Sequence, residues 1–292
     1  MNKIAFFLSI FILTTVIGLY VGHNLIPQVG ETSPITGKPV EDVSNSLFFF
    51  AYIITVTAVL LVVMKFYKGR LLFKVLEVLI IFVGSQIVYS FLLYDLLAAL
   101  GLLETVTQMQ YEISIILLAV LTVVVRFIRR RFLVLNVTLS VAIAGAGGLL
   151  GATLGFAPSL LLVIGLSVYD VVSVFGTKHM LKLADQSRLR DLPVMFETPS
   201  KGIKTGPRKG VRPSEDILGL GTGDIAIPLV FFVSVLRDFG WMNVLGAMIG
   251  AMFGLGLTIY YVTHVKRIAL PALPPIIGFS LLGFAVSWVL GM

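Results

Sequence analysis

The stretch "GLGTGDIAIPL", residues 219–229, places an acidic residue in a run that is otherwise apolar enough to lie in lipid. Asp224 follows Gly221 and Gly223 and precedes Pro228 by four residues. A proline at that spacing removes the N–H that would bond the carbonyl of Asp224, and its ring presses on the same carbonyl. The pattern predicts a kinked or loosened turn that faces protein or water, and the buried charge indicates a functional residue.

The composition of the chain is that of a membrane protein. Of its 292 residues 58% are hydrophobic and 13% are charged, and the mean hydropathy is +1.01. A soluble domain of this length could not bury so much apolar surface. The absence of cysteine excludes disulfides, cysteine nucleophiles and thiolate metal sites. The net charge of +7 comes from short basic clusters between apolar runs, which favours a membrane protein over a nucleic-acid-binding one.

Nine stretches have the roughly 20 mostly apolar residues that a membrane-spanning helix needs. They are residues 4–22, 45–64, 71–94, 111–128, 132–151, 158–177, 217–236, 241–263 and 270–290. The first is longer than a usual signal-peptide core and has no clear cleavage site, so we expect it to be retained. The sequence therefore predicts an all-α, multi-pass protein of the cell membrane with nine transmembrane helices.

The basic residues fix the expected orientation, because Lys and Arg accumulate on the cytoplasmic side of a membrane. With the N-terminus cytoplasmic and the C-terminus extracytoplasmic, only Lys38 and Arg237 of the 22 Lys and Arg residues fall outside. Residues 1–184 then hold six spans and residues 217–292 hold three. Between them, residues 185–216 read as a flexible cytoplasmic loop rich in proline and charge.

Inside that loop, "LPVMFETP" at residues 192–199 is an apolar island. We expect it to be a hydrophobic anchor of the loop, docked on the membrane or filling a groove.

Three acidic residues fall within the predicted spans. Glu77 lies one turn from Lys74 near the cytoplasmic start of its span, which predicts a local ion pair or a snorkelling side chain. Asp170 lies eight residues before Lys178, and Asp224 lies seven residues after Ile217. At 1.5 Å per residue both carboxyl groups are ~10–12 Å from the cytoplasmic edge, on antiparallel neighbours, and can face each other.

Two adjacent carboxyl groups cannot easily both ionise, so they share a proton. One can then take a proton from a water molecule while the other polarises a carbonyl, as in an aspartic protease. The three histidines lie near span ends and no H-E-x-x-H motif is present, which disfavours metalloprotease and serine-dyad chemistry. A transporter or channel that moves protons or cations on the same two carboxylates is the alternative.

The motifs around these acids resemble those of the GxGD intramembrane aspartyl proteases. They are Tyr169-Asp170, Gly221-x-Gly223-Asp224 and Pro271-Ala272-Leu273. Their order and the nine-span plan match along nearly the whole chain. The orientation and "ALPALP" at 269–274 are similar to presenilin more than to signal peptide peptidase, and the short chain is typical of an archaeal homologue.

The resemblance implies an intramembrane aspartic endopeptidase that acts on single-span membrane proteins in the lipid bilayer. It implies catalytic roles for Asp170 and Asp224, and substrate contacts for Tyr169, Gly221, Thr222, Gly223, Pro271, Ala272 and Leu273. It implies no cofactor, metal or nucleic acid. A homo-oligomer is left open, and no accessory subunit can be read from the sequence. Thr222 departs from the pattern, because presenilins usually carry Leu there.

Glycines have two expected uses in the chain. Gly221 and Gly223 leave room for a substrate backbone beside Asp224. In the eighth span, Gly246, Gly250 and Gly254 recur every four residues, which predicts close packing against a neighbouring helix. Tyr169 is expected to line the substrate cleft or to pack between helices.

Overall fold

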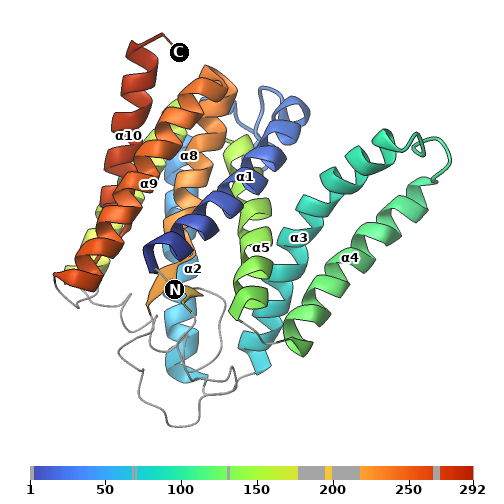
Figure 1. Cartoon of the computed structure of the whole chain (residues 1–292), viewed down its shortest axis with the longest axis horizontal. Helices are drawn as coiled ribbons and strands as arrows, with labels where there is room; N and C mark the ends of the chain where they lie inside the picture. Colours follow the sequence, from blue (N-terminus) through green and yellow to red (C-terminus); the bar gives the residue numbers. More distant parts are fainter. Residues whose placement is uncertain are drawn as a thin grey trace.

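A computed structural model describes residues 3–67, 69, 71–129, 132–176, 195–198, 218–265 and 270–291. These ranges contain nine α-helices, a π-helical turn and two short strands (Figure 1). The elements are α1 (Lys3–Val29), α2 (Ser44–Phe66), α3 (Leu71–Ala99), α4 (Gln108–Ile128), α5 (Phe132–Ala152), α6 (Phe156–Val171), η1 (Val172–Gly176), β1 (Met195–Glu197), β2 (Gly219–Gly221), α8 (Gly223–Phe239), α9 (Trp241–His264) and α10 (Leu273–Val289). The predicted all-α fold with nine helices is confirmed.

The last third of the chain departs from the predicted spans at two points. We expected helices from 217 and from 270, but α8 begins at Gly223 and α10 at Leu273. Residues 219–221 form β2 instead, and prolines crowd the start of α10. Seven helices in the described ranges are long and apolar enough to cross a membrane, whereas α8 and α10 have 17 residues each. Their length of ~25 Å is shorter than a typical hydrocarbon core.

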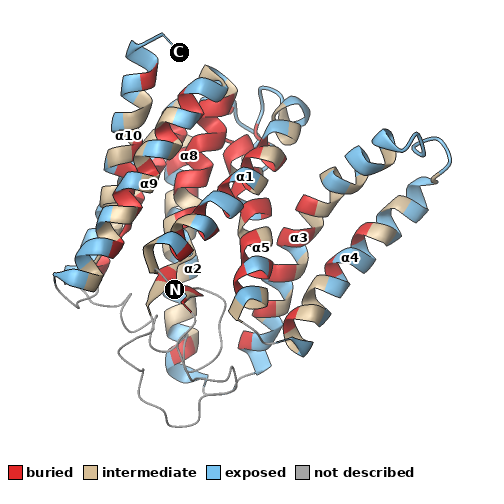
Figure 2. Cartoon of the chain, in the orientation of Figure 1, coloured by how far each residue is buried: buried red, intermediate tan, exposed pale blue. Residues whose placement is uncertain are grey.

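Helix α8 lies at the centre of the bundle (Figure 1). It contacts α1, α5, α6, α9 and α10, and every residue from Pro228 to Leu236 is buried. Figure 2 shows burial concentrated on α8 and the helix faces around it, while α2 and α4 are largely exposed. A helix that is apolar on all sides needs such a place, because it has no polar face for solvent.

Glycines on two neighbouring helices hold α8 at short range. Leu229 and Val233, one turn apart on α8, are fully buried. The Leu229 side chain occupies the space that a Cβ at either Gly18 or Gly147 would need, and Val233 does the same at Gly22 and Gly151. The glycines of α1 and α5 therefore form two notches that fix the height of α8 in the bundle.

Helices α9 and α10 pack backbone against backbone, as the glycine spacing of the eighth span predicts. A Cβ at Gly246 would meet the carbonyl oxygen of Gly283, one at Gly250 that of Phe279, and one at Gly254 that of Pro275. Gly256, on the same helix, has no heavy atom within 4 Å of a Cβ built there.

This difference gives a matched pair of variants. We expect Gly250→Ala to push α10 away from α9 and to lower the free energy of unfolding by about 1–3 kcal/mol. Gly256→Ala should leave stability unchanged or slightly raised, because alanine favours helix and meets nothing there. Thermal unfolding in detergent micelles measures both. Equal midpoints for the two variants would contradict the close packing.

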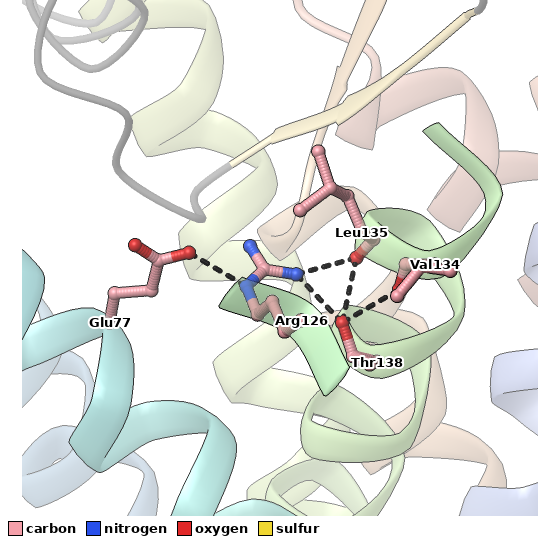
Figure 3. A network of polar contacts seen from close by, with 5 residues as sticks. All are labelled: Glu77, Arg126, Val134, Leu135 and Thr138. Atoms are coloured by element: carbon pink, nitrogen blue, oxygen red, sulfur yellow. Dashed lines mark hydrogen bonds and ion pairs between the residues drawn. The ribbon is translucent and has the colours of Figure 1, made fainter. Parts of the chain in front are cut away.

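Helices α3 and α4 form a hairpin that leans away from the rest of the bundle, and a buried ion pair inside the hairpin also donates hydrogen bonds to α5 (Figures 1 and 3). The Arg126 Nε donates to the Glu77 carboxylate at 2.7 Å, and Arg126 Nη1 donates to the Leu135 carbonyl at 2.7 Å and to the Thr138 hydroxyl at 2.8 Å. Glu77 and Arg126 are 7% and 5% exposed. The predicted local pair of Glu77 with Lys74 is therefore wrong. Lys74 is exposed, whereas Arg126 reaches Glu77 from the facing helix.

Removing one member of this pair should leave the other as an uncompensated buried charge. We expect Arg126→Leu to cost about 3–5 kcal/mol of stability. The control Lys74→Ala should change it by less than about 0.5 kcal/mol. The double variant Glu77→Leu, Arg126→Leu should be less destabilised than the sum of the two single variants, as measured by thermal unfolding. A simple sum would show that the two residues act independently.

Candidate active site

Asp170 and Asp224 lie on the two facing helices α6 and α8. Asp170 is the second-last residue of α6, and Asp224 is the second residue of α8. Helices α6 and α8 pack antiparallel, with the start of α6 bonded to the end of α8, so the ends that carry the two aspartates also adjoin. The structure thus brings together the two carboxylates that the sequence places at matching depth.

Asp224 is held from the strand that precedes it. The N–H of Gly221, the last residue of β2, donates to Asp224 Oδ2 at 3.1 Å. A Cβ at Gly221 would lie 3.0 Å from the same oxygen, so a side chain there would press on the carboxylate. A Cβ at Gly223 would meet only Ile227 Cδ1, at 3.7 Å. Asp224 also lies in the first turn of α8, where the helix dipole favours negative charge.

Asp170 is held from the start of the last helix. The N–H of Leu273 donates to Asp170 Oδ2 at 3.2 Å, across 103 positions of sequence. Pro271, Ala272 and Leu273 are all buried, and α10 begins only at Leu273, so this N–H belongs to the first turn. The first N–H groups of a helix have no partner within the helix. The Pro-Ala-Leu segment therefore directs one such N–H group, that of Leu273, toward the Asp170 carboxylate.

A two-stranded antiparallel sheet lies immediately before Asp224. Met195 pairs with Gly221, Phe196 with Leu220 and Glu197 with Gly219. Thr198 extends the ladder, with its N–H donating to the Leu218 carbonyl at 3.1 Å. Phe196 is completely buried in the main core. Residues 195–198 belong to the apolar island, for which we expected anchoring and not strand pairing. The rest of residues 185–216 lies outside the described ranges.

Tyr169 and Thr222, two other predicted site residues, make contacts within the helix bundle. The Tyr169 ring packs edge-on against Phe50 of α2, with 6.5 Å between ring centroids. Thr222 precedes α8, and its carbonyl accepts the N–H of Ala226 at 2.9 Å. No three His, Asp or Glu side chains gather as metal ligands within the described part of the chain.

Two features of α6 and α8 have no clear signal in the sequence. A π-helical turn, η1, begins two residues after Asp170, and Ser173 inside it donates to the Asp170 carbonyl at 2.9 Å. Near the opposite ends of the helices, the buried hydroxyls of Ser159 on α6 and Ser234 on α8 are hydrogen-bonded to each other. Single serines in apolar spans are too common to predict such a pair.

The ends of α6 and α8 remote from the two acids are joined by carboxyl groups. Asp238, at the end of α8, accepts the N–H of Phe156 at the start of α6 at 2.8 Å. Glu41, in the loop between α1 and α2, lies against Gly155 and near Asp238. Loss of water around its carboxyl group and then the neighbouring Asp238 raise the pKa of Glu41, against the weaker opposing effect of the Phe156 and Ala157 N–H groups.

This raised pKa gives stability a pH dependence. The folded protein favours protonated Glu41 more than the unfolded chain does, so its contribution is present below the ordinary glutamate pKa. It is lost as the pH rises through the raised value. We expect Glu41→Gln to remove this part of the decline in melting temperature, measured across the acidic to neutral range. An unchanged decline in Glu41→Gln would contradict the assignment.

Comparisons with known proteins identify the family. Residues 7–291 match the family described as "Signal-peptide peptidase, presenilin aspartyl protease". The signal peptide peptidases of Mus musculus and Homo sapiens are each 32% identical over 128 residues, which is 40% of this chain and 32% of each relative. The aligned part thus spans about a third of those relatives' length.

Two solved structures of a presenilin family intramembrane aspartate protease, in space groups C222 and P2, share the fold. Both have a TM-score of 0.68 and 23% identity, and they cover 98% and 99% of this chain and 99% of their own. At that identity the likeness supports the architecture alone. The family match extends over nearly the whole sequence and includes both aspartates. This multi-pass membrane chain therefore belongs to the signal-peptide peptidase and presenilin aspartyl protease family.

Proposed function

We propose that this chain is an intramembrane aspartic endopeptidase, which hydrolyses peptide bonds within transmembrane segments of membrane proteins, with Asp170 and Asp224 as its catalytic pair. The observation that carries the proposal is the meeting of two carboxyl groups on α6 and α8, each bonded by one backbone N–H. A structural acid needs a cation or several donors to neutralise it. Among the described residues, neither acid forms an ion pair with Lys, Arg or His, and both keep part of their surface exposed.

The chemistry follows from one shared proton. The ionised carboxylate takes a proton from a water molecule, whose oxygen attacks the scissile carbonyl. The protonated carboxyl donates a hydrogen bond to that carbonyl and stabilises the developing oxyanion. The proton taken from water then passes to the leaving amine, and the C–N bond breaks to give a carboxylic acid and an amine. The Gly221 and Leu273 N–H groups keep both carboxyl groups oriented during these steps.

A groove between α6 and α10 leads toward this site. It has a volume of about 260 Å³ and is lined mainly by apolar residues, which include Val171, next to Asp170, and Pro274, next to Leu273. A transmembrane substrate satisfies its own hydrogen bonds, so cleavage requires it to unwind locally. The non-helical backbone at β2 and at Pro271–Ala272 offers hydrogen-bonding groups to such an unwound segment.

The proposal predicts that each aspartate is required. Asp170→Asn and Asp224→Asn should each lower cleavage of a purified single-span substrate by on the order of 10²–10⁴-fold, because neither variant can hold the shared proton. Asp238→Asn, at the other end of α8, is the matched control. It keeps an oxygen for the Phe156 N–H and should retain activity. Full activity in either Asp170→Asn or Asp224→Asn would exclude the pair as the catalyst.

A second measurement distinguishes proteolysis from ion conduction on the same two carboxylates. Proteoliposomes with wild-type protein can be tested for proton flux and for cleavage of a co-reconstituted substrate. Proteolysis that depends on both aspartates supports the protease. Flux that is lost in the same variants, with no cleavage by the wild type, would support the transporter instead. The family match favours the protease.

A further inference from the structure

The side chain of Asn136 on α5 binds β1 as a neighbouring strand would. Its Nδ2 donates to the Glu197 carbonyl at 2.9 Å, and its Oδ1 accepts the Glu197 N–H at 3.2 Å. Asn136 is only 4% exposed. A carboxamide carries the same donor and acceptor as a peptide group, so it can close the open edge of a strand. Both backbone groups of one β1 residue are thus satisfied by one side chain.

The bonds of Asn136 and those of β2 fall on opposite edges of β1. Thr198 turns its N–H to the Leu218 carbonyl of the β2 side. Adjacent residues of a strand direct their N–H and C=O groups to opposite edges, so Glu197 directs its own away from β2. Asn136 therefore holds the outer edge of β1 without competing for any bond of the β1–β2 ladder.

Helix α5 is itself held next to Asn136. Arg126 donates to the Leu135 carbonyl and to the Thr138 hydroxyl, which flank Asn136 in the sequence (Figure 3). The same guanidinium is paired with Glu77 of α3. Burying two charges costs desolvation free energy, so a buried ion pair adds little net stability. Its directional hydrogen bonds nevertheless fix the relative positions of the groups that it joins. The turn of α5 that carries Asn136 is fixed in this way against α3 and α4.

A short path through hydrogen-bonded and adjacent residues leads from Asn136 to a catalytic carboxylate. Asn136 holds Glu197 in β1, β1 forms an antiparallel ladder with β2, and β2 ends at Gly221, which lies opposite Met195. The Gly221 N–H then bonds Asp224. We propose that Asn136 is a positioning residue for the catalytic reaction, which sets the place of β2 and thereby the orientation of Asp224; this inference rests on the proposed proteolytic function.

The test compares Asn136→Leu with Asn243→Leu. Asn243 is a matched control because it is also 4% exposed, but it bonds the Phe239 carbonyl and Ser287 in the part of the bundle formed by α8, α9 and α10. Both variants should lower the melting temperature. Only Asn136→Leu should lower kcat, by at least about tenfold with KM changed less than about twofold, because a misplacement of about 1 Å can cost on the order of 10²-fold in rate.

A second variant and a second readout keep the test decisive. Asn136→Asp retains an acceptor for the Glu197 N–H but loses the donor, so its kcat should lie between those of wild type and Asn136→Leu. Hydrogen exchange measured by mass spectrometry should speed up over residues 195–198 and 218–224 in Asn136→Leu and stay unchanged there in Asn243→Leu.

Faster exchange without a fall in kcat would overturn the positioning role and leave Asn136 a purely structural residue. Unchanged exchange would show that the Asn136 hydrogen bonds to Glu197 do not hold β1 in place. A wild-type protein that is folded but cleaves no substrate would refute the proposed function. The exchange data would still report separately on whether Asn136 holds β1.

Discussion

A carboxyl group inside an apolar bundle needs hydrogen-bond donors, and the rest of this structure depends on where they come from. The interior of a regular helix has no free N–H to give. The donors to Asp224 and Asp170 come from the end of β2 and from the first turn of α10, where the helical ladder is absent. The two helices that the sequence predicts as long spans are therefore short, since each loses the residues that serve the acids.

The surrounding bundle compensates for these interruptions. Broken backbone is tolerated at membrane depth only when protein or water covers it. Helix α8 is enclosed by five other helices, and glycine notches on α1 and α5 seat Leu229 and Val233. The start of α10 is covered because α9 approaches it at Gly254 without any intervening side chain. Small residues thus allow the dense packing that makes a non-helical site possible.

The parts of the site that could be predicted from the sequence are those set by local geometry. The rise of a helix places Asp170 and Asp224 at one depth, and residue spacing predicts the contact of Gly250 with another helix. The donor Leu273 is 103 residues from Asp170, and the register of β1 on β2 depends on a fold that spacing does not encode. Glu77 shows the same limit. Lys74 is its neighbour along the helix, but Arg126 is its partner in space.

The hydrogen-bonded hydroxyls of Ser159 and Ser234 link α6 and α8 at a point remote from the two aspartates. Asp170 is eleven residues along α6 from Ser159, and Asp224 is ten residues back along α8 from Ser234. Each carboxyl group thus lies roughly 15 Å along its helix from the hydroxyl pair. A tilt of about 5° between the helices moves one carboxyl group relative to the other by roughly 1 Å, enough to change a reaction rate on the order of 10²-fold. A change in the tilt between α6 and α8 would therefore alter the reaction rate without any change at the aspartates themselves.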